Sequence, residues 1–119
     1  MSAIESSTLE FDNGVSVTLP YHARAIRRVN GVVLVLLDPD HYLKDAPYQA
    51  AQRSGEPALR NLIAFDAHGT KAWDAELPET LDYYYLIEDG LPIRVLSYSG
   101  YRCVIDLSNG RIIGREFLK

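Results

Sequence analysis

Residues 61–77 read NLIAFDAHGTKAWDAEL, two short apolar stretches on either side of a His-Gly turn. A related stretch, YRCVIDLSNGRIIGREF, occupies residues 101–117. Placing Phe65-Asp66 on Ile105-Asp106 aligns the two copies at an offset of 40 residues (105 − 65), and a glycine turn follows in both. Four strands and their turns span about 40 residues. The repeat therefore predicts two antiparallel units of four strands each.

Turn signals divide the rest of the chain into further short strands. Residues 9–19 alternate apolar and polar side chains around Asp12-Asn13-Gly14, which predicts a hairpin. After the Asn30-Gly31 turn, residues 32–37 are apolar at every position, so we expect a central strand covered on both faces. The remaining strands are expected near residues 25–29, 61–66, 71–77, 82–87, 93–98, 101–107 and 111–117. The pattern predicts a mainly β chain, an antiparallel meander of about ten strands.

An irregular stretch, residues 38–60, interrupts the first unit. Within it, residues 46–54 follow an aspartate, begin with Ala-Pro and end before a glycine, which predicts one short helix. We therefore expect a single domain, with one repeat at about residues 25–77 that carries an insertion at 38–60, and a second repeat at 82–118.

The second repeat reads YYYLIEDGLPIRVLSYSGYRCVIDLSNGRIIGREF, and it resembles a blade of quinoprotein-type and tryptophan-aspartate-type β-propellers. In residues 61–77, Trp73 stands near the position that such blades give to a tryptophan after the glycine turn. The resemblance implies two blade-like sheets, whereas closed propellers use four or more blades. We expect a sandwich or half-open barrel made of two such sheets; the alternative is a propeller fragment completed by another chain.

Composition excludes several classes of protein. Of the 119 residues, 47% are hydrophobic and 24% charged, with a net charge of −4, which is typical of a soluble globular protein. Scattered basic residues on an acidic chain give no footprint for nucleic acid. The start lacks the pattern of a signal peptide, and the longest apolar run, residues 32–37, is too short to span a membrane. We expect a cytoplasmic protein without a membrane partner, in which the lone Cys103 is a small buried hydrophobe.

Candidate chemical groups are few. Asp38, Asp40 and His41 could supply metal ligands, but no further ligand is forced to converge on them, so a solvated turn is the expected role. Glu88-Asp89 precedes a glycine and is also expected in a turn. The chain contains no nucleophile-elbow serine, no phosphate-binding glycine loop and no His-Glu metal motif. We therefore expect no metal, no cofactor and no enzymatic activity.

Tyrosine is the unusual component, with eight tyrosines against three phenylalanines. In a strand, Tyr83 and Tyr85 would share one face and Tyr84 the other. One role for these rings is packing against Tyr98 and Tyr101. The other is a contact surface for a basic partner, formed with acidic neighbours. The candidate partner-binding residues are Asp38, Asp40, His41, Asp82, Tyr83, Tyr85, Glu88 and Asp89.

These features favour a small intracellular protein-binding protein. In size and arrangement the chain is similar to small bacterial immunity proteins of polymorphic toxin systems, although no motif carries that similarity. The similarity implies an inhibitor that covers the active site of a toxin, whose cleft would be basic if the toxin acts on nucleic acid. The alternative is a non-catalytic scaffolding module that self-associates through its strand edges.

Overall fold

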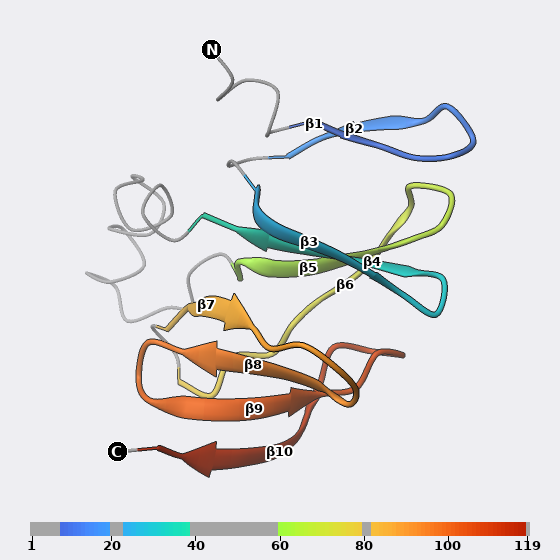
Figure 1. Cartoon of the computed structure of the whole chain (residues 1–119). Coiled ribbons are helices and arrows are strands. Elements are labelled where there is room, and N and C mark those ends of the chain that lie inside the picture. The colour runs from blue at the N-terminus through green and yellow to red at the C-terminus, as the bar shows by residue number, and fades with distance from the viewer. Residues whose placement is uncertain (1–7, 20–22, 39–59, 80–81, 119) are drawn as a thin grey trace.

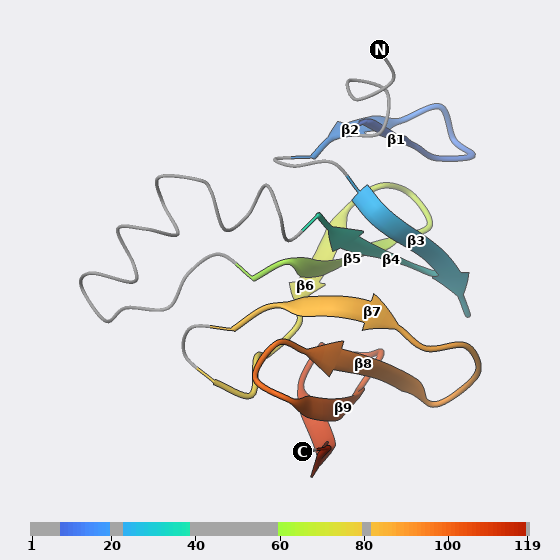
Figure 2. The same cartoon turned by 60° about the vertical axis from the view of Figure 1, so that its left-hand side comes forward.

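The computed structural model describes residues 8–19, 23–38, 60–79 and 82–118. Its ten strands form three antiparallel sheets, one of two strands and two of four strands. Figure 2 shows them as three successive layers, with the hairpin first, the sheet β3–β6 in the middle and the sheet β7–β10 last. The predicted mainly β fold of about ten strands is confirmed. The predicted helix, residues 46–54, lies outside the described residues.

The first layer is the hairpin of β1 (Thr8–Glu10) and β2 (Ser16–Thr18). The side chain of Asn13 shapes its turn, because Oδ1 accepts the amide of Val15 at 3.1 Å and Nδ2 donates to the carbonyl of His68 at 3.1 Å. The turn of the hairpin is thus tied to a turn of the next layer.

The first sheet contains β3 (Ala23–Val29), β4 (Val32–Leu37), β5 (Leu62–Asp66) and β6 (Lys71–Asp74) in the order of the chain. Strand β4 pairs with both β3 and β5, and every residue from 33 to 37 is buried. The predicted central strand is confirmed, because both of its faces are covered by other layers.

The second sheet contains β7 (Tyr84–Ile87), β8 (Ile93–Ser97), β9 (Tyr101–Ile105) and β10 (Ile112–Phe117), again in chain order (Figure 1). Along β8, buried side chains alternate with half-buried ones. Only one face of this sheet therefore packs into the protein core.

Two hydrophobic cores separate the three layers. The first lies between the hairpin and the first sheet, and it contains Leu9, Phe11, Leu19, Val33, Val35, Leu37, Ile63 and Phe65. The second lies between the two sheets, and it contains Leu34, Leu36, Leu62, Ala64, Trp73, Ala75, Tyr84, Ile93, Val95, Cys103 and Ile105. Successive residues along β4, and likewise along β5, thus point into opposite cores, because side chains alternate between the two faces of a strand.

Hydrogen bonds from side chains connect the two sheets. The indole Nε1 of Trp73 donates to the carbonyl of Leu107 at 3.0 Å. Arg27 donates to the carbonyls of Glu88 and Gly90 at 2.8 and 2.7 Å. The fully buried Asn61 accepts the amide of Tyr84 at 3.0 Å and donates to its carbonyl at 2.8 Å. The two buried bonds of Asn61 satisfy backbone groups of Tyr84 that would otherwise have no partner between the packed layers.

The register of the strands repeats between the sheets. The pairs Leu34↔Ala64 and Leu36↔Leu62 in β4 and β5 correspond to Arg94↔Val104 and Leu96↔Arg102 in β8 and β9. In this correspondence β9 follows β5 by 40 residues (102 − 62), the offset seen in the sequence. A register shift follows in both sheets, between Ala64 and Phe65 and between Ile112 and Gly114. The two sheets are therefore copies of one four-stranded unit in their pairing pattern.

The aspartates that revealed the repeat have the same structural role in both copies. Asp66 Oδ1 accepts the amides of His68 and Thr70 at 2.8 and 3.0 Å. Asp106 Oδ1 accepts the amide and hydroxyl of Ser108 at 2.9 and 2.7 Å. These bonds favour the charged carboxylate, so they lower the pKa of both aspartates below the usual value of 3.8. Each aspartate thus stabilises the turn that ends its strand.

Candidate functional site

Exposed apolar side chains gather on the second sheet and its turns. Among the described residues, seven of the nine large hydrophobic side chains that remain exposed belong to residues 85–118. They are Tyr85, Leu86, Leu91, Tyr98, Ile113, Phe117 and Leu118. The hairpin and the first sheet contribute only Val15 and Ile26. An uneven distribution of this kind marks the second sheet as the candidate contact surface.

Two pairs of aromatic rings flank the turn between β8 and β9. Tyr83 and Tyr98 stack with their centroids 5.1 Å apart and an interplanar angle of 16°. Tyr101 and Phe117 are tilted, with centroids also 5.1 Å apart, and the guanidinium of Arg115 lies 5.2 Å from the centroid of Tyr101. We refer to Tyr83, Tyr98, Tyr101 and Phe117 as the aromatic end of the second sheet. Tyr98 is 65% exposed and Phe117 is 56% exposed, so half of these rings face solvent.

A buried carboxylate holds the turn that carries Tyr98. Asp82 Oδ1 accepts the amides of Tyr83 at 2.8 Å and of Ser99 at 3.1 Å, and Oδ2 accepts the hydroxyl of Ser99 at 2.5 Å. The amide of Tyr98 donates to the carbonyl of Tyr83 at 2.9 Å. Because charged acceptors form the stronger hydrogen bonds, the exposed ring of Tyr98 projects from a firmly held turn.

The outer face is the face of the second sheet that is turned away from the first sheet. The register places Leu86, Leu96, Arg102 and Glu116 in one row across it, and Arg94, Val104 and Gly114 in the next row. Arg102 Nε donates to both carboxylate oxygens of Glu88 at 3.1 and 3.3 Å, and Nη1 donates to Glu116 at 3.1 Å. These bonds raise the pKa of Arg102 above its usual value. The outer face therefore mixes apolar side chains with two arginines, of which Arg102 is ion-paired with Glu88 and Glu116.

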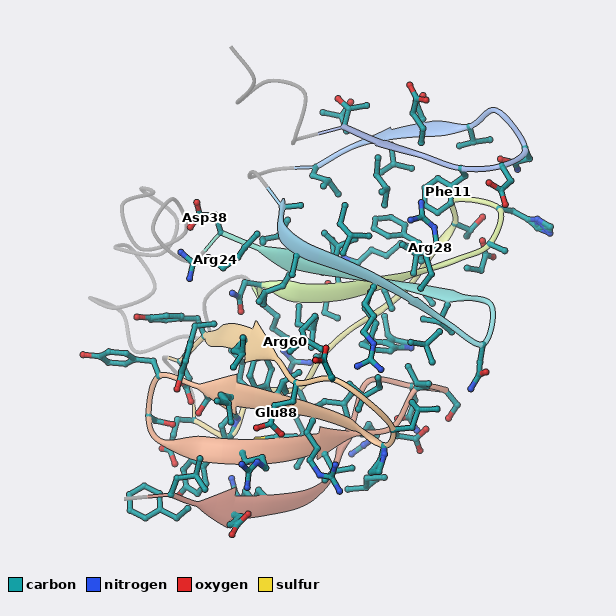
Figure 3. All side chains as sticks on the ribbon, in the orientation of Figure 1. Phe11, Arg24, Arg28, Asp38, Arg60 and Glu88 are labelled. Carbon is teal, nitrogen blue, oxygen red and sulfur yellow. The ribbon has the colours of Figure 1, made fainter. Side chains whose placement is uncertain are left out.

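Those candidate partner-binding residues that the structure describes do not lie together in one acidic patch. Asp38 follows β4, and its Oδ1 lies 3.4 Å from Nη2 of Arg24. Figure 3 shows it in a different layer from Glu88, which is ion-paired with Arg102. Asp89 is exposed in the turn after β7. Asp40 and His41 lie outside the described residues.

Two expectations about the tyrosine-bearing strand need correction. Asp82 is fully buried, so it cannot contact a partner directly and instead holds the β8–β9 turn. Tyr83 and Tyr85 do not share an alternating face, because β7 begins at Tyr84 and its register shifts between Tyr84 and Leu86. Tyr83 stacks on Tyr98, as the packing alternative predicted, whereas Tyr85 is exposed beside the shift.

Sequence reasoning missed six exposed residues of this surface as contact residues: Leu86, Leu91, Tyr98, Ile113, Phe117 and Leu118. The signal was available for Tyr98, since an aromatic residue directly before a Ser-Gly turn is placed at the end of a sheet. No local signal identified Phe117, because its exposure depends on the edge position of β10 in the sheet.

The buried reactive groups have structural roles. The hydroxyl of Tyr84 donates to the carbonyl of Glu76, and burial raises its pKa. Burial also raises the pKa of Cys103, which is fully buried in the second core, as the sequence predicted. A thiol of raised pKa is a poor nucleophile. Within residues 8–19, 23–38, 60–79 and 82–118, no group of three or more His, Cys, Asp or Glu side chains could hold a metal ion.

A largely apolar cleft of about 340 Å³ lies between β2 and the first sheet. Leu19, Leu37, Ile63 and Phe65 belong to its lining, and the ion pair of Lys71 with Asp74, at 2.7 Å, lies beside it. In the part of the chain that the structure describes, no helix has the length and apolar character needed to cross a membrane.

Comparison with known proteins gives a family and no relatives of known activity. No curated protein and no solved structure is significantly similar to the chain. The match to a family extends over residues 1–117, almost the whole chain. The protein therefore belongs to the family described as "Domain of unknown function (DUF7957)".

Proposed function

We propose that this protein is a small, non-catalytic protein-binding protein of the bacterial cytoplasm that acts as an immunity-type inhibitor, covering the active site of a toxin. The observation that carries the proposal is the concentration of exposed apolar side chains on the second sheet. Exposed apolar side chains concentrated in one part of a protein can mark an interaction site, and tyrosine and arginine are among the residues enriched at the centre of protein interfaces.

The aromatic end supports the proposal because its geometry is set before a partner arrives. Tyr98 projects from a turn that Asp82 and Ser99 hold, and its ring already stacks on Tyr83. Ordering a side chain during association costs about 0.5 to 1.5 kcal/mol. A ring that is already ordered avoids most of that cost, so Tyr98 suits a high-affinity contact.

The net charge of the whole molecule, rather than any local group of charges, supports a basic partner. The net charge of −4 favours association with a positively charged cleft over long distances. At short range, Asp38 and Glu88 are already paired with Arg24 and Arg102. We therefore expect salt to slow association while the apolar contacts of the second sheet hold the complex together.

The experiment is co-expression with the polypeptide encoded by the adjacent reading frame. If that polypeptide is a toxin, the intact protein restores growth, and a one-to-one complex can be purified. A double variant, Tyr98→Ala with Phe117→Ala, removes exposed rings and should weaken the purified complex at least about 30-fold, as loss of hot-spot side chains does. The control is Ile26→Ala, which removes an exposed side chain from the first sheet. No toxic neighbour and no captured partner would overturn the proposal.

A self-associating scaffold is the second candidate. It rests on Ile113 and Phe117, which are exposed on the edge strand β10. However, the same strand carries Arg115, Glu116 and a register shift, which are features that protect sheet edges from pairing. Light scattering distinguishes the two, since a scaffold gains mass with concentration and an inhibitor stays a monomer without its partner.

A further inference from the structure

The two sheets have the same orientation in the stack, so that equivalent faces are turned towards the preceding layer. Ile63 and Phe65 of β5 face the preceding layer, the hairpin, and the equivalent Cys103 and Ile105 of β9 face the preceding layer, the first sheet. The other face of the first sheet packs against the second sheet through four fully buried side chains. They are Leu34, Leu36, Leu62 and Ala64. Their equivalents on the outer face are Arg94, Leu96, Arg102 and Val104, and no described residue covers them as a further layer.

The outer face has a glycine, Gly114, where the first sheet has its tryptophan. By register, Trp73 pairs with Ala64, and Gly114 pairs with the equivalent Val104. Trp73 reaches into the next layer and donates to the carbonyl of Leu107. At Gly114 an added Cβ would meet only Val104, at 3.8 Å, and the backbone there is not left-handed. The space is therefore open to a side chain from outside.

The two arginines of the outer face differ in their partners. Arg102 is held by Glu88 and Glu116, so its charge is neutralised within the sheet. Arg94 is half-buried, and its guanidinium makes no hydrogen bond or ion pair with any residue that the structure describes. A layer placed on this face would bury Arg94, and burial of an unpaired charge is costly. A layer that packs on this face therefore needs a carboxylate opposite Arg94.

We propose that the outer face receives one β-layer, a hairpin or sheet edge, from the partner protein, which inserts an apolar side chain beside Gly114 and pairs a carboxylate with Arg94. The inference rests on the proposed function and names the surface and the kind of partner. The partner's layer packs on the second sheet as the second sheet packs on the first. A second copy of this chain is a poor occupant, because the carboxylate on its own outer face, that of Glu116, is already paired with Arg102. Its other equivalent face, on the first sheet, is already covered by the hairpin.

Site-directed photo-crosslinking in the full chain tests this surface. A benzophenone side chain at Leu86, which is exposed at the rim of the outer face, should give one crosslinked product in the source cells. Mapping should place the crosslink in a strand or hairpin of the partner, next to Asp or Glu. The same label at Ile26, exposed on the first sheet, is the control and should give none.

Two variants decide whether the product reflects the proposed contacts. Gly114→Leu covers the open position beside Val104, and Arg94→Glu reverses the charge, so each should lower the crosslinking yield at least about 30-fold. Ile26→Ala, which removes an exposed side chain from the first sheet, should leave the yield unchanged. Thermal unfolding should show that Gly114→Leu folds as the unaltered chain does.

The outcomes separate this inference from the proposed function. No product from Leu86, a product containing two copies of this chain, or a yield that Gly114→Leu and Arg94→Glu do not change would each overturn the β-layer at the outer face. If such variants still bind the co-expressed toxin, the immunity function stands and uses another surface. If no partner is captured by any form of the chain, both proposals fail.

Discussion

The ring of Trp73 lies directly against Gly110, so closely that a Cβ at position 110 would be 2.3 Å from Cε3 of the indole. The contact joins β6 of the first sheet to the turn before β10 of the second. Gly110 also has a φ of 76°, which residues that carry a side chain rarely adopt. Gly110→Ala should therefore lower the free energy of unfolding by about 3 kcal/mol, from overpacking and the left-handed backbone.

Urea unfolding measures this loss, and Gly90→Ala is the control. Gly90 has a φ of 90° but open space around it, so its substitution isolates the backbone cost of about 1 kcal/mol. Equal losses at both positions would show that the ring of Trp73 does not constrain Gly110.

Trp73→Phe tests the hydrogen bond that crosses between the sheets. The variant keeps an aromatic ring in the second core but leaves the carbonyl of Leu107 without its donor. A buried group left without a partner costs about 1 to 3 kcal/mol, and because this bond is part-buried we expect a loss at the lower end of that range from chemical denaturation. Tyr85→Phe, at an exposed position, should change stability by less than about 0.5 kcal/mol. A Trp73→Phe variant as stable as the original would contradict the role of this bond.

Asn61→Ala should be among the most destabilising polar substitutions. Asn61 is fully buried and bonds the carbonyl of Leu37 as well as both backbone groups of Tyr84. Its removal leaves these groups unsatisfied and should cost about 3 kcal/mol or more. Asn109→Ala, in an exposed turn with one bond to the amide of Arg111, should cost no more than about 1.5 kcal/mol. Thermal unfolding of both variants checks the difference, and similar melting temperatures would refute it.

The turn aspartates predict a pH dependence. Asp66 and Asp106 have pKa values below 3.8 in the folded chain, so each carboxylate stabilises the fold above about pH 4. That contribution disappears as the pH falls through the lowered pKa and the carboxylate becomes protonated. Asp66→Ala should therefore be less stable than the unaltered chain at pH 7, and the difference should shrink towards zero near pH 2. Denaturant titrations at both pH values, with the exposed Glu79→Ala as a charge control, would contradict this if the difference stayed constant.

Much of the fold followed from local chemistry. Glycine and asparagine turns placed the hairpins, and the uninterrupted apolar residues of β4 showed that both of its faces are covered. The alternation of Tyr83, Tyr84 and Tyr85 failed as a guide because a register shift falls within that run. A shift of this kind depends on pairing with β8 and leaves no local trace.

The contact surface was harder to predict because the exposure of its residues depends on partners that are distant in the sequence. Asp82 is buried through bonds to Ser99, which is 17 positions away. Glu88 looked like a free turn residue, but Arg102 on β9 pairs with it. Tyr98 and Phe117 become a surface only when β8, β9 and β10 lie side by side. Long-range pairing, rather than residue type, therefore decided which candidates remain exposed.

The central claim is that the second sheet is the contact surface for a partner protein. Hydroxyl-radical footprinting of the full chain, alone and in the complex from co-expression, tests it most directly. The account predicts that oxidation of Leu86, Leu96, Tyr98 and Phe117 falls several-fold in the complex, while oxidation of Val15 and Ile26 is unchanged. Protection of Val15 and Ile26 with no change on the second sheet would contradict it.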